Sequence, residues 1–255
     1  MSAKARLQTM QLLVGVGVVA LWAFANAFDL ATSILPPIVD VGRQFFAVLA
    51  RPEFLSGFGA TVFDAARGLL IAALLAIPLG VLIGMMPKLE VATRVLVDFG
   101  RSFPVIALLP VLVLLLGATQ TMKVVAIVIA CFFPILLQSI YGARNLDPTI
   151  VDTVRSFRIP AHLRFFKVLL PAAGPFIATG LRIATTVSVL VAVGVEIVSV
   201  TPGIGREIAF SRSYNETATT YAYIIYAGLL GVVLTLLWDL AEARLLRWHS
   251  RSKVE

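Results

Sequence analysis

The chain has 255 residues, of which 59% are hydrophobic and only 14% charged, and its formal net charge is +7. Soluble domains are about 45–50% apolar and about 25% charged, so this composition excludes an ordinary soluble protein. The long continuous apolar stretches also exclude a membrane β-barrel, whose strands alternate in hydrophobicity over about ten residues. We therefore expect an all-α, polytopic membrane protein.

Six apolar stretches are long enough to cross a bilayer, which requires about 20 mostly apolar residues for ~30 Å of hydrocarbon. The first follows Lys4 and Arg6 as a signal peptide would, but its apolar run exceeds that of a usual signal peptide, so we interpret it as a retained helix. About six helices leave little room for a soluble domain, and we expect a single membrane domain over residues 1–255. The predicted spans cover residues 10–28, 68–87, 103–122, 124–143, 172–200 and 217–238.

The positions of Lys and Arg predict the orientation, because short cytoplasmic loops collect basic residues. With the N-terminus inside, most basic residues fall in the tails and in the loops after the second and fourth spans, whereas Lys123 falls in a short outer loop. Both termini are therefore expected in the cytoplasm. The positive net charge follows from this topology and requires no nucleic-acid partner.

Signatures of metal binding, ATP binding and catalysis are missing from the sequence. The single cysteine, Cys131, lies in an apolar span and is interpreted as a buried apolar side chain. The chain has no His-x-x-x-His or Cys-x-x-Cys spacing and no Gly-x-x-x-x-Gly-Lys-Ser/Thr loop. We expect no metal site, no catalytic residues and no cofactor bound by this chain.

A polar segment over about 147–170 interrupts the apolar pattern between the fourth and fifth spans. Asp147-Pro148 has the pattern of an N-cap followed by proline at the first helical position. Val154 and Phe157 then continue an apolar helical spacing until Pro160 breaks it. A short amphipathic helix on the cytoplasmic face either lies in the lipid interface or inserts into a groove of a partner protein.

This segment resembles the Glu-Ala-Ala loop of binding-protein-dependent ABC importer permeases. Asp152-Thr153-Val154 stands at the Glu-Ala-Ala position, Arg158 stands where the family usually has glycine, and Leu170-Pro171 closes the motif. Further motifs resemble the nitrate/sulfonate/taurine branch of that family: Arg101-Ser102-Phe103-Pro104, Phe132-Phe133-Pro134, Gly180-Leu181-Arg182, Glu196 and Gly203-Ile204-Gly205.

The resemblance implies a type I importer permease in the cytoplasmic membrane of a prokaryote. It implies a second permease subunit, expected to be identical, two cytosolic ATPase subunits that bind ATP and Mg²⁺, and an external solute-binding protein. The substrate would be a small organic or inorganic anion such as a sulfonate, taurine or nitrate, and the chain itself would not be an enzyme. The ATPase-coupling residues implied are Asp152, Val154, Arg155, Ser156, Phe157, Arg158, Ile159 and Pro160.

The fifth predicted span contains two charges, Arg182 and Glu196. A charge at membrane depth costs at least a few kcal/mol, so such residues are candidates for function. They are about 21 Å apart along a helix and share one side of it with Thr185 and Val189. We hypothesise that these four residues line a translocation path; the alternative is that the charges lie at the interfaces or pair with neighbouring helices.

Two other functions remain open from the residues alone. One is an ion-coupled secondary transporter, although the halves of the chain show no convincing inverted repeat. The other is a membrane scaffold whose basic cytoplasmic loop binds lipid headgroups. An intramembrane protease is excluded, because no predicted span contains a histidine or a pair of carboxylates.

Overall fold

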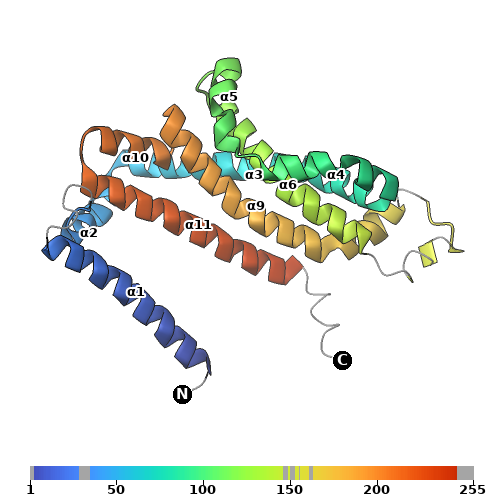
Figure 1. Cartoon of the computed structure of the whole chain (residues 1–255), viewed down its shortest axis with the longest axis horizontal. Coiled ribbons are helices and arrows are strands. Elements are labelled where there is room, and N and C mark those ends of the chain that lie inside the picture. Colours follow the sequence, from blue (N-terminus) through green and yellow to red (C-terminus); the bar gives the residue numbers. More distant parts are fainter. Residues whose placement is uncertain are drawn as a thin grey trace.

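The computed structural model describes residues 3–28, 35–145, 149, 153–154, 156–160 and 163–245. Within these ranges the chain is helical and contains no β-strand, as expected for an all-α protein. The long helices lie side by side in an elongated bundle (Figure 1). In chain order the elements are α1 (Ala3–Ala27), α2 (Ile38–Ala47), η1 (Val48–Ala50), α3 (Pro52–Met85), α4 (Pro87–Ser102), η2 (Val105–Leu108), α5 (Leu109–Leu116), α6 (Gln120–Arg144), η3 (Arg164–Leu169), α9 (Leu170–Ser199), α10 (Ile204–Ser213) and α11 (Thr217–Leu245).

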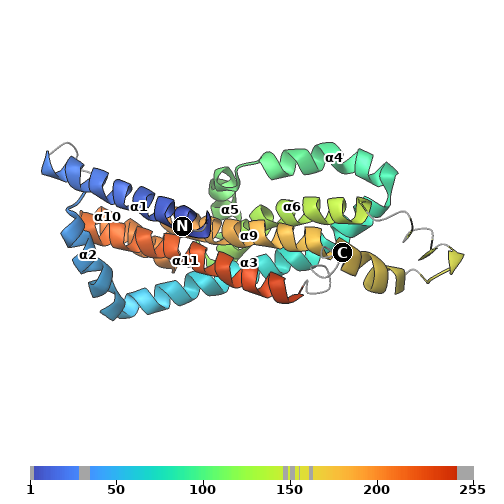
Figure 2. The same cartoon turned by 90° about the horizontal axis from the view of Figure 1, so that it is seen from below.

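Four stretches of the described chain are long and apolar enough to cross a membrane: Pro52–Met85, Gln120–Arg144, Arg164–Ser199 and Thr217–Arg244. They correspond to four of the six predicted spans. The predicted first span lies in α1, whose apolar part, Leu12–Ala27, is shorter. α1 diverges from the bundle (Figure 1) and, seen from below, runs in front of it (Figure 2). Near the C-terminal end of α1, Trp22 Nε1 donates to the carbonyl of Pro36, just before α2, at 3.1 Å.

The remaining span differs from the prediction of one continuous helix over 103–122. α4 is followed by η2 and α5, which together cover Val105–Leu116. The chain bends by 85° between α4 and this second stretch. Pro104 precedes the bend, and Gly117 ends α5 with φ of +68°, a conformation that glycine adopts without strain. Thr119 then caps α6 by accepting a hydrogen bond from the Met122 amide at 3.2 Å. Residues 120–122 therefore belong to the next helix.

The core is formed by α3, α6 and α9. Small residues recur every four positions on the face of α3 that meets α6, which lets two helix backbones approach closely. All of them are buried: Gly68, Ala72, Ala76, Gly80 and Gly84.

Contacts along the core helices show their relative directions. Gly68 adjoins Ile127 and Gly84 adjoins Ala143, so α3 and α6 run parallel. α9 runs antiparallel to both, since Gly142 adjoins Ala173 at one end and Lys123 pairs with Glu196 at the other. The C-terminal ends of α3 and α6 and the start of α9 meet at one end of the bundle, called here the loop end. The opposite end contains the start of α6 together with α10.

Candidate functional site

The predicted coupling segment lies at the loop end, between α6 and α9. The Phe157 amide donates to the Thr153 carbonyl at 3.0 Å, and the Ile159 amide donates to the Val154 carbonyl at 3.2 Å. Arg158 has φ of +49°, so a residue in left-handed conformation ends the turn. The bond from Ile159 to Val154, with the left-handed Arg158 just before Ile159, matches the longer hydrogen bond of a Schellman-type helix terminus, in which glycine is the usual residue. Arg158 thus adopts at this position the conformation that a glycine would supply.

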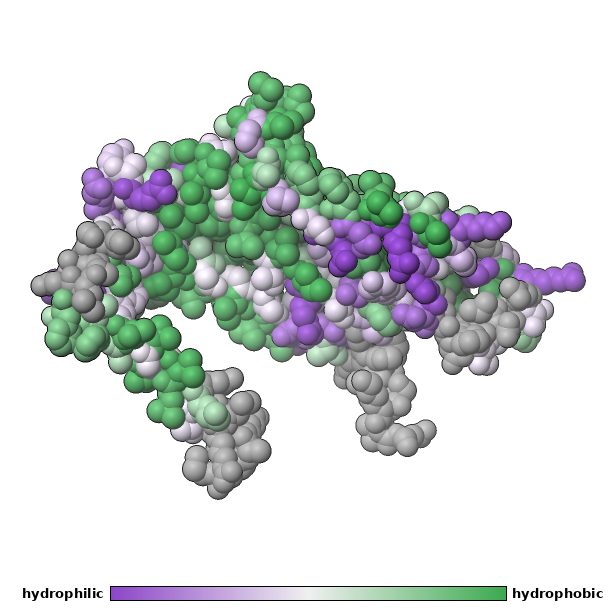
Figure 3. Space-filling model, in the orientation of Figure 1, coloured by the Kyte–Doolittle hydropathy of each residue, from purple (hydrophilic) through white to green (hydrophobic). Residues whose placement is uncertain are grey.

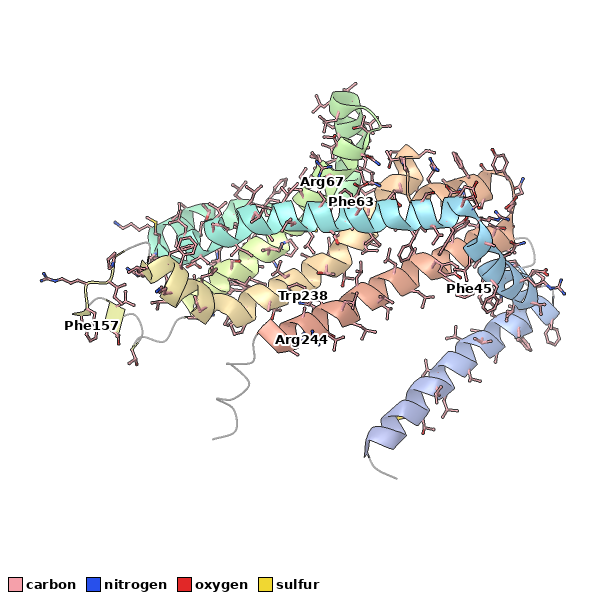
Figure 4. The ribbon with its side chains drawn as sticks, turned by 180° about the vertical axis from the view of Figure 1, so that it is seen from behind. Phe45, Phe63, Arg67, Phe157, Trp238 and Arg244 are labelled. Carbon is pink, nitrogen blue, oxygen red and sulfur yellow. The ribbon has the colours of Figure 1, made fainter. Side chains whose placement is uncertain are left out.

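The side chains of this segment divide into a buried anchor and an exposed tip. The side chain of Val154 is buried, whereas that of Phe157 is 77% exposed. Ser156 and Arg158 are exposed as well. Figure 4 shows Phe157 beyond the helix ends, at the extremity opposite to Phe45. Ile159 is half-buried and Pro160 exposed. The predicted contacts Asp152 and Arg155 lie outside the described residues.

A buried charge cluster occupies the opposite end of the core. The Lys123 ammonium of α6 lies 2.7 Å from Asp64 Oδ2 of α3 and 3.0 Å from Glu196 Oε1 of α9. The side chains of Lys123 and Glu196 are fully buried, and that of Asp64 is 4% exposed. Because an unpaired buried charge is costly, this geometry holds the three core helices together through one cation.

The same cluster fixes the connection between α9 and α10. Lys123 Nζ donates to the Pro202 carbonyl at 2.7 Å, and the Gly205 amide donates to Glu196 Oε2 at 2.9 Å. The Thr61 hydroxyl lies 2.9 Å from both Glu196 Oε1 and the Ile204 amide, so it can donate to the first and accept from the second. These two amides belong to the first turn of α10, where a helix favours nearby negative charge.

Close packing at this turn requires glycine at position 203. A Cβ added to Gly203 would overlap the Glu196 carboxylate. The Gly203-Ile204-Gly205 motif singled out in the sequence therefore forms a backbone cradle for the Glu196 side chain.

The sequence patterns did not predict this cluster. The pattern of apolar stretches predicts Lys123 in an outer loop between two spans, but Lys123 lies within α6 and is buried. The contacts join residues 73 and 135 positions apart, which no local pattern reveals. The one available signal was the chemistry of Glu196, since a carboxylate in an apolar helix requires a cation or hydrogen-bond donors nearby.

The four residues of the hypothesised path lie on α9 in different environments. Thr185, Val189 and Glu196 are buried within the chain. The side chain of Arg182 is 47% exposed and forms ion pairs with α11, at 3.1 Å to Asp239 and 2.7 Å to Glu242. Both charges thus pair with neighbouring helices, which was the alternative considered from the sequence. Figure 3 shows hydrophilic side chains gathered toward the loop end, a smaller hydrophilic group at the opposite end, and a mainly hydrophobic surface between them.

Comparison with protein families identifies the chain. Residues 76–247 match the profile of the binding-protein-dependent transport system inner membrane component. The chain belongs to this family. The match begins within α3 and includes the whole of α6, α9 and α11 and the segment between α6 and α9.

Curated relatives are permeases of the branch that the sequence motifs resemble. The chain is 26% identical to the putative aliphatic sulfonates transport permease protein SsuC of Bacillus subtilis, over 91% of this chain and 85% of the relative. It is 32% identical to the bicarbonate transport system permease protein CmpB of Synechococcus elongatus, over 76% and 68%. The taurine transport system permease protein TauC of Escherichia coli is 24% identical, over 89% and 85%.

Solved structures support the fold of this permease. A chain of the MetNI methionine ABC transporter in an inward-facing conformation has a TM-score of 0.65 at 17% identity, with 74% of this chain and 94% of that chain covered. A chain of an amino acid ABC transporter solved with histidines has a TM-score of 0.58 at 20% identity, with coverage of 78% and 96%. The permease therefore has the type I ABC importer fold and is a multi-pass protein of the inner membrane.

Proposed function

We propose that this permease is one half of the membrane pore of an ATP-driven importer, with a second, identical subunit as the other half. Two cytosolic ATPase subunits would bind ATP and Mg²⁺ and contact the coupling segment, whereas this chain would hold no cofactor. The observation that carries the proposal is the exposed Phe157, presented on a fixed helix terminus at the loop end. An exposed aromatic side chain on a short helical turn fits a groove in a partner protein.

The core helices offer a direct route for transmitting motion from the coupling segment. α6 ends at Arg144 just before the segment, and α9 begins at Leu170 just after it. Each is a long helix, and the 25 residues of α6 correspond to about 37 Å at 1.5 Å per residue. At the opposite end the two helices are joined again by Lys123 and Glu196. Displacement of the segment would therefore move both helices together.

We propose a small anion, such as a sulfonate, taurine, nitrate or bicarbonate, as the substrate, delivered by an external solute-binding protein. The support for this class comes from the relatives, whose names refer to aliphatic sulfonates, taurine and bicarbonate. The four hypothesised path residues stay a prediction; Arg182 already pairs with two carboxylates of α11, Asp239 and Glu242, so its charge is not available to balance an anion. The loop end would face the cytoplasm, and so would both termini.

The test of the proposal is co-purification of the tagged permease from detergent, with the ATPase subunit expressed alongside it. The wild-type chain should retain the ATPase, and the variant Phe157→Asp should lose most of it. A charge placed on a side chain that must be desolvated in a groove costs several kcal/mol, and about 3 kcal/mol already weakens binding more than a hundredfold.

The matched control is Tyr214→Asp. Tyr214 is an aromatic residue of similar exposure, 73%, between α10 and α11 at the opposite end of the bundle. This variant should retain the ATPase as the wild type does. If Phe157→Asp and Tyr214→Asp retain equal amounts of the ATPase, Phe157 has no role in coupling. If the wild-type chain never retains an ATPase, the result favours a lipid-binding scaffold or a secondary transporter.

A further inference from the structure

A cavity of about 540 Å³ opens at the loop end of the bundle, beside the coupling segment. Its walls come from the C-terminal ends of α3 and α6, the first two turns of α4 and the start of η3. The lining residues are Gly84, Met85, Pro87, Glu90, Val91, Arg94, Ala143, Arg144, Arg164 and Leu169.

The cavity contains more positive than negative charge. Arg144 Nη1 lies 2.6 Å from Glu90 Oε1, so this arginine and this glutamate neutralise each other. Among the described residues, Arg94 and Arg164 form no ion pair. Two arginines from different elements, α4 and η3, therefore line one cavity, and no carboxylate in the described part of the chain pairs with either of them.

Arginine pairs of this kind suit a phosphate group. The planar guanidinium donates two parallel hydrogen bonds to phosphate oxygens, and such charge-assisted bonds are about twice as strong as neutral ones. α4 begins at Pro87 on the wall of the same cavity, so its N-terminal partial charge adds to the positive potential. A tetrahedral dianion would balance both arginines, whereas a phosphodiester, with its single charge, would balance one and could accept hydrogen bonds from both.

The surface that continues from the cavity is apolar. Val91 lies on the cavity wall, and Val95 and Phe99 follow it at four-residue intervals along α4. Their exposed fractions are 72%, 79% and 63%. Residues spaced by four share one side of a helix, so a stripe of exposed apolar side chains leads away from the basic cavity. A basic pocket followed by an apolar stripe matches a headgroup followed by an acyl chain.

We propose that this cavity binds a phosphate group, with the headgroup of an anionic phospholipid as the source that the apolar stripe favours and free phosphate as the other source. The bound headgroup would sit against α3, α4, α6 and η3 at once, and would link the lipid to the helices that flank the coupling segment. This binding needs neither ATP nor a transported substrate, so its test is independent of the proposed function.

The experiment measures ligand binding to the detergent-purified chain by native mass spectrometry and by thermal shift. Three probes are compared: phosphatidylglycerol, the zwitterionic phosphatidylcholine, and inorganic phosphate. The site variant is Arg94→Gln with Arg164→Gln. The control variant is Arg67→Gln with Arg212→Gln, two exposed arginines in the half of the bundle away from the cavity, of which Figure 4 labels Arg67. Gel filtration confirms that both double variants stay folded.

Phosphatidylglycerol should bind more tightly than phosphatidylcholine, and the site variant should weaken that binding by about tenfold or more, since it removes two charge-assisted hydrogen-bond donors. Inorganic phosphate binding that is lost in the site variant, with no preference for the anionic lipid, would support the site and assign it to free phosphate. Equal binding of every probe by the two double variants would overturn the proposal, as would no binding to the wild type.

Discussion

Replacing Lys123 by methionine should destabilise the folded permease by about 3–5 kcal/mol, the range measured when one partner of a buried ion pair is removed. Methionine is close to lysine in length and fills most of the space that the Lys123 side chain occupies, so the loss of charge dominates the effect. Asp64 and Glu196 would then be two buried carboxylates without a cation, and the Pro202 carbonyl would lose its donor. The measurement is thermal unfolding in detergent followed by circular dichroism.

Two further variants separate charge from packing in this experiment. Glu196→Gln should be milder than Lys123→Met, because an amide oxygen at the position of Oε2 can still accept from Thr61 and Gly205 while Lys123 retains Asp64. Lys167→Met removes an exposed lysine of η3 and should leave the unfolding temperature nearly unchanged. If Lys123→Met unfolds at the same temperature as Lys167→Met, the charge cluster does not stabilise the core.

The apolar helices of this permease could be predicted from sequence because the physical requirement behind them is local. A segment that crosses hydrocarbon must satisfy its own backbone hydrogen bonds and present apolar side chains along its length. The predicted spans at 124–143 and 172–200 accordingly match α6 and α9 to within four residues. The predicted 68–87 covers only part of α3, since the first sixteen residues of that helix mix polar and apolar side chains.

The failures of prediction occurred where the decisive interactions are not local. Mean hydropathy over 103–122 is high whether the segment is one helix or, as found, a helix sharply bent against α4 and ended by Gly117. The partners of Lys123 come from helices that only the tertiary fold brings together. For Arg158, the sequence indicated that a glycine position was occupied by arginine, but only the backbone shows that the left-handed conformation is kept.

The close contact between α3 and α6 leads to the second large effect: Gly80→Ala should destabilise the permease by about 1–3 kcal/mol, the cost of overpacking a core. A Cβ at Gly80 would lie 2.5 Å from the Ser139 Cβ and 2.7 Å from the Leu136 carbonyl oxygen. A backbone carbonyl cannot rotate away as a side chain can, so the two helices must separate. Thermal unfolding in detergent measures the effect.

Gly59→Ala is the matched control, because Gly59 belongs to the same helix and a Cβ there meets nothing within 4 Å. In a helix interior alanine is favoured over glycine by about 1 kcal/mol, so this variant should unfold at the wild-type temperature or above it. Both variants gain the same helix propensity, and any difference between them reports the helix contact. If Gly80→Ala is as stable as Gly59→Ala, α3 and α6 can separate at little cost. The two helices would then move independently, and a displacement of the coupling segment could shift α6 without α3.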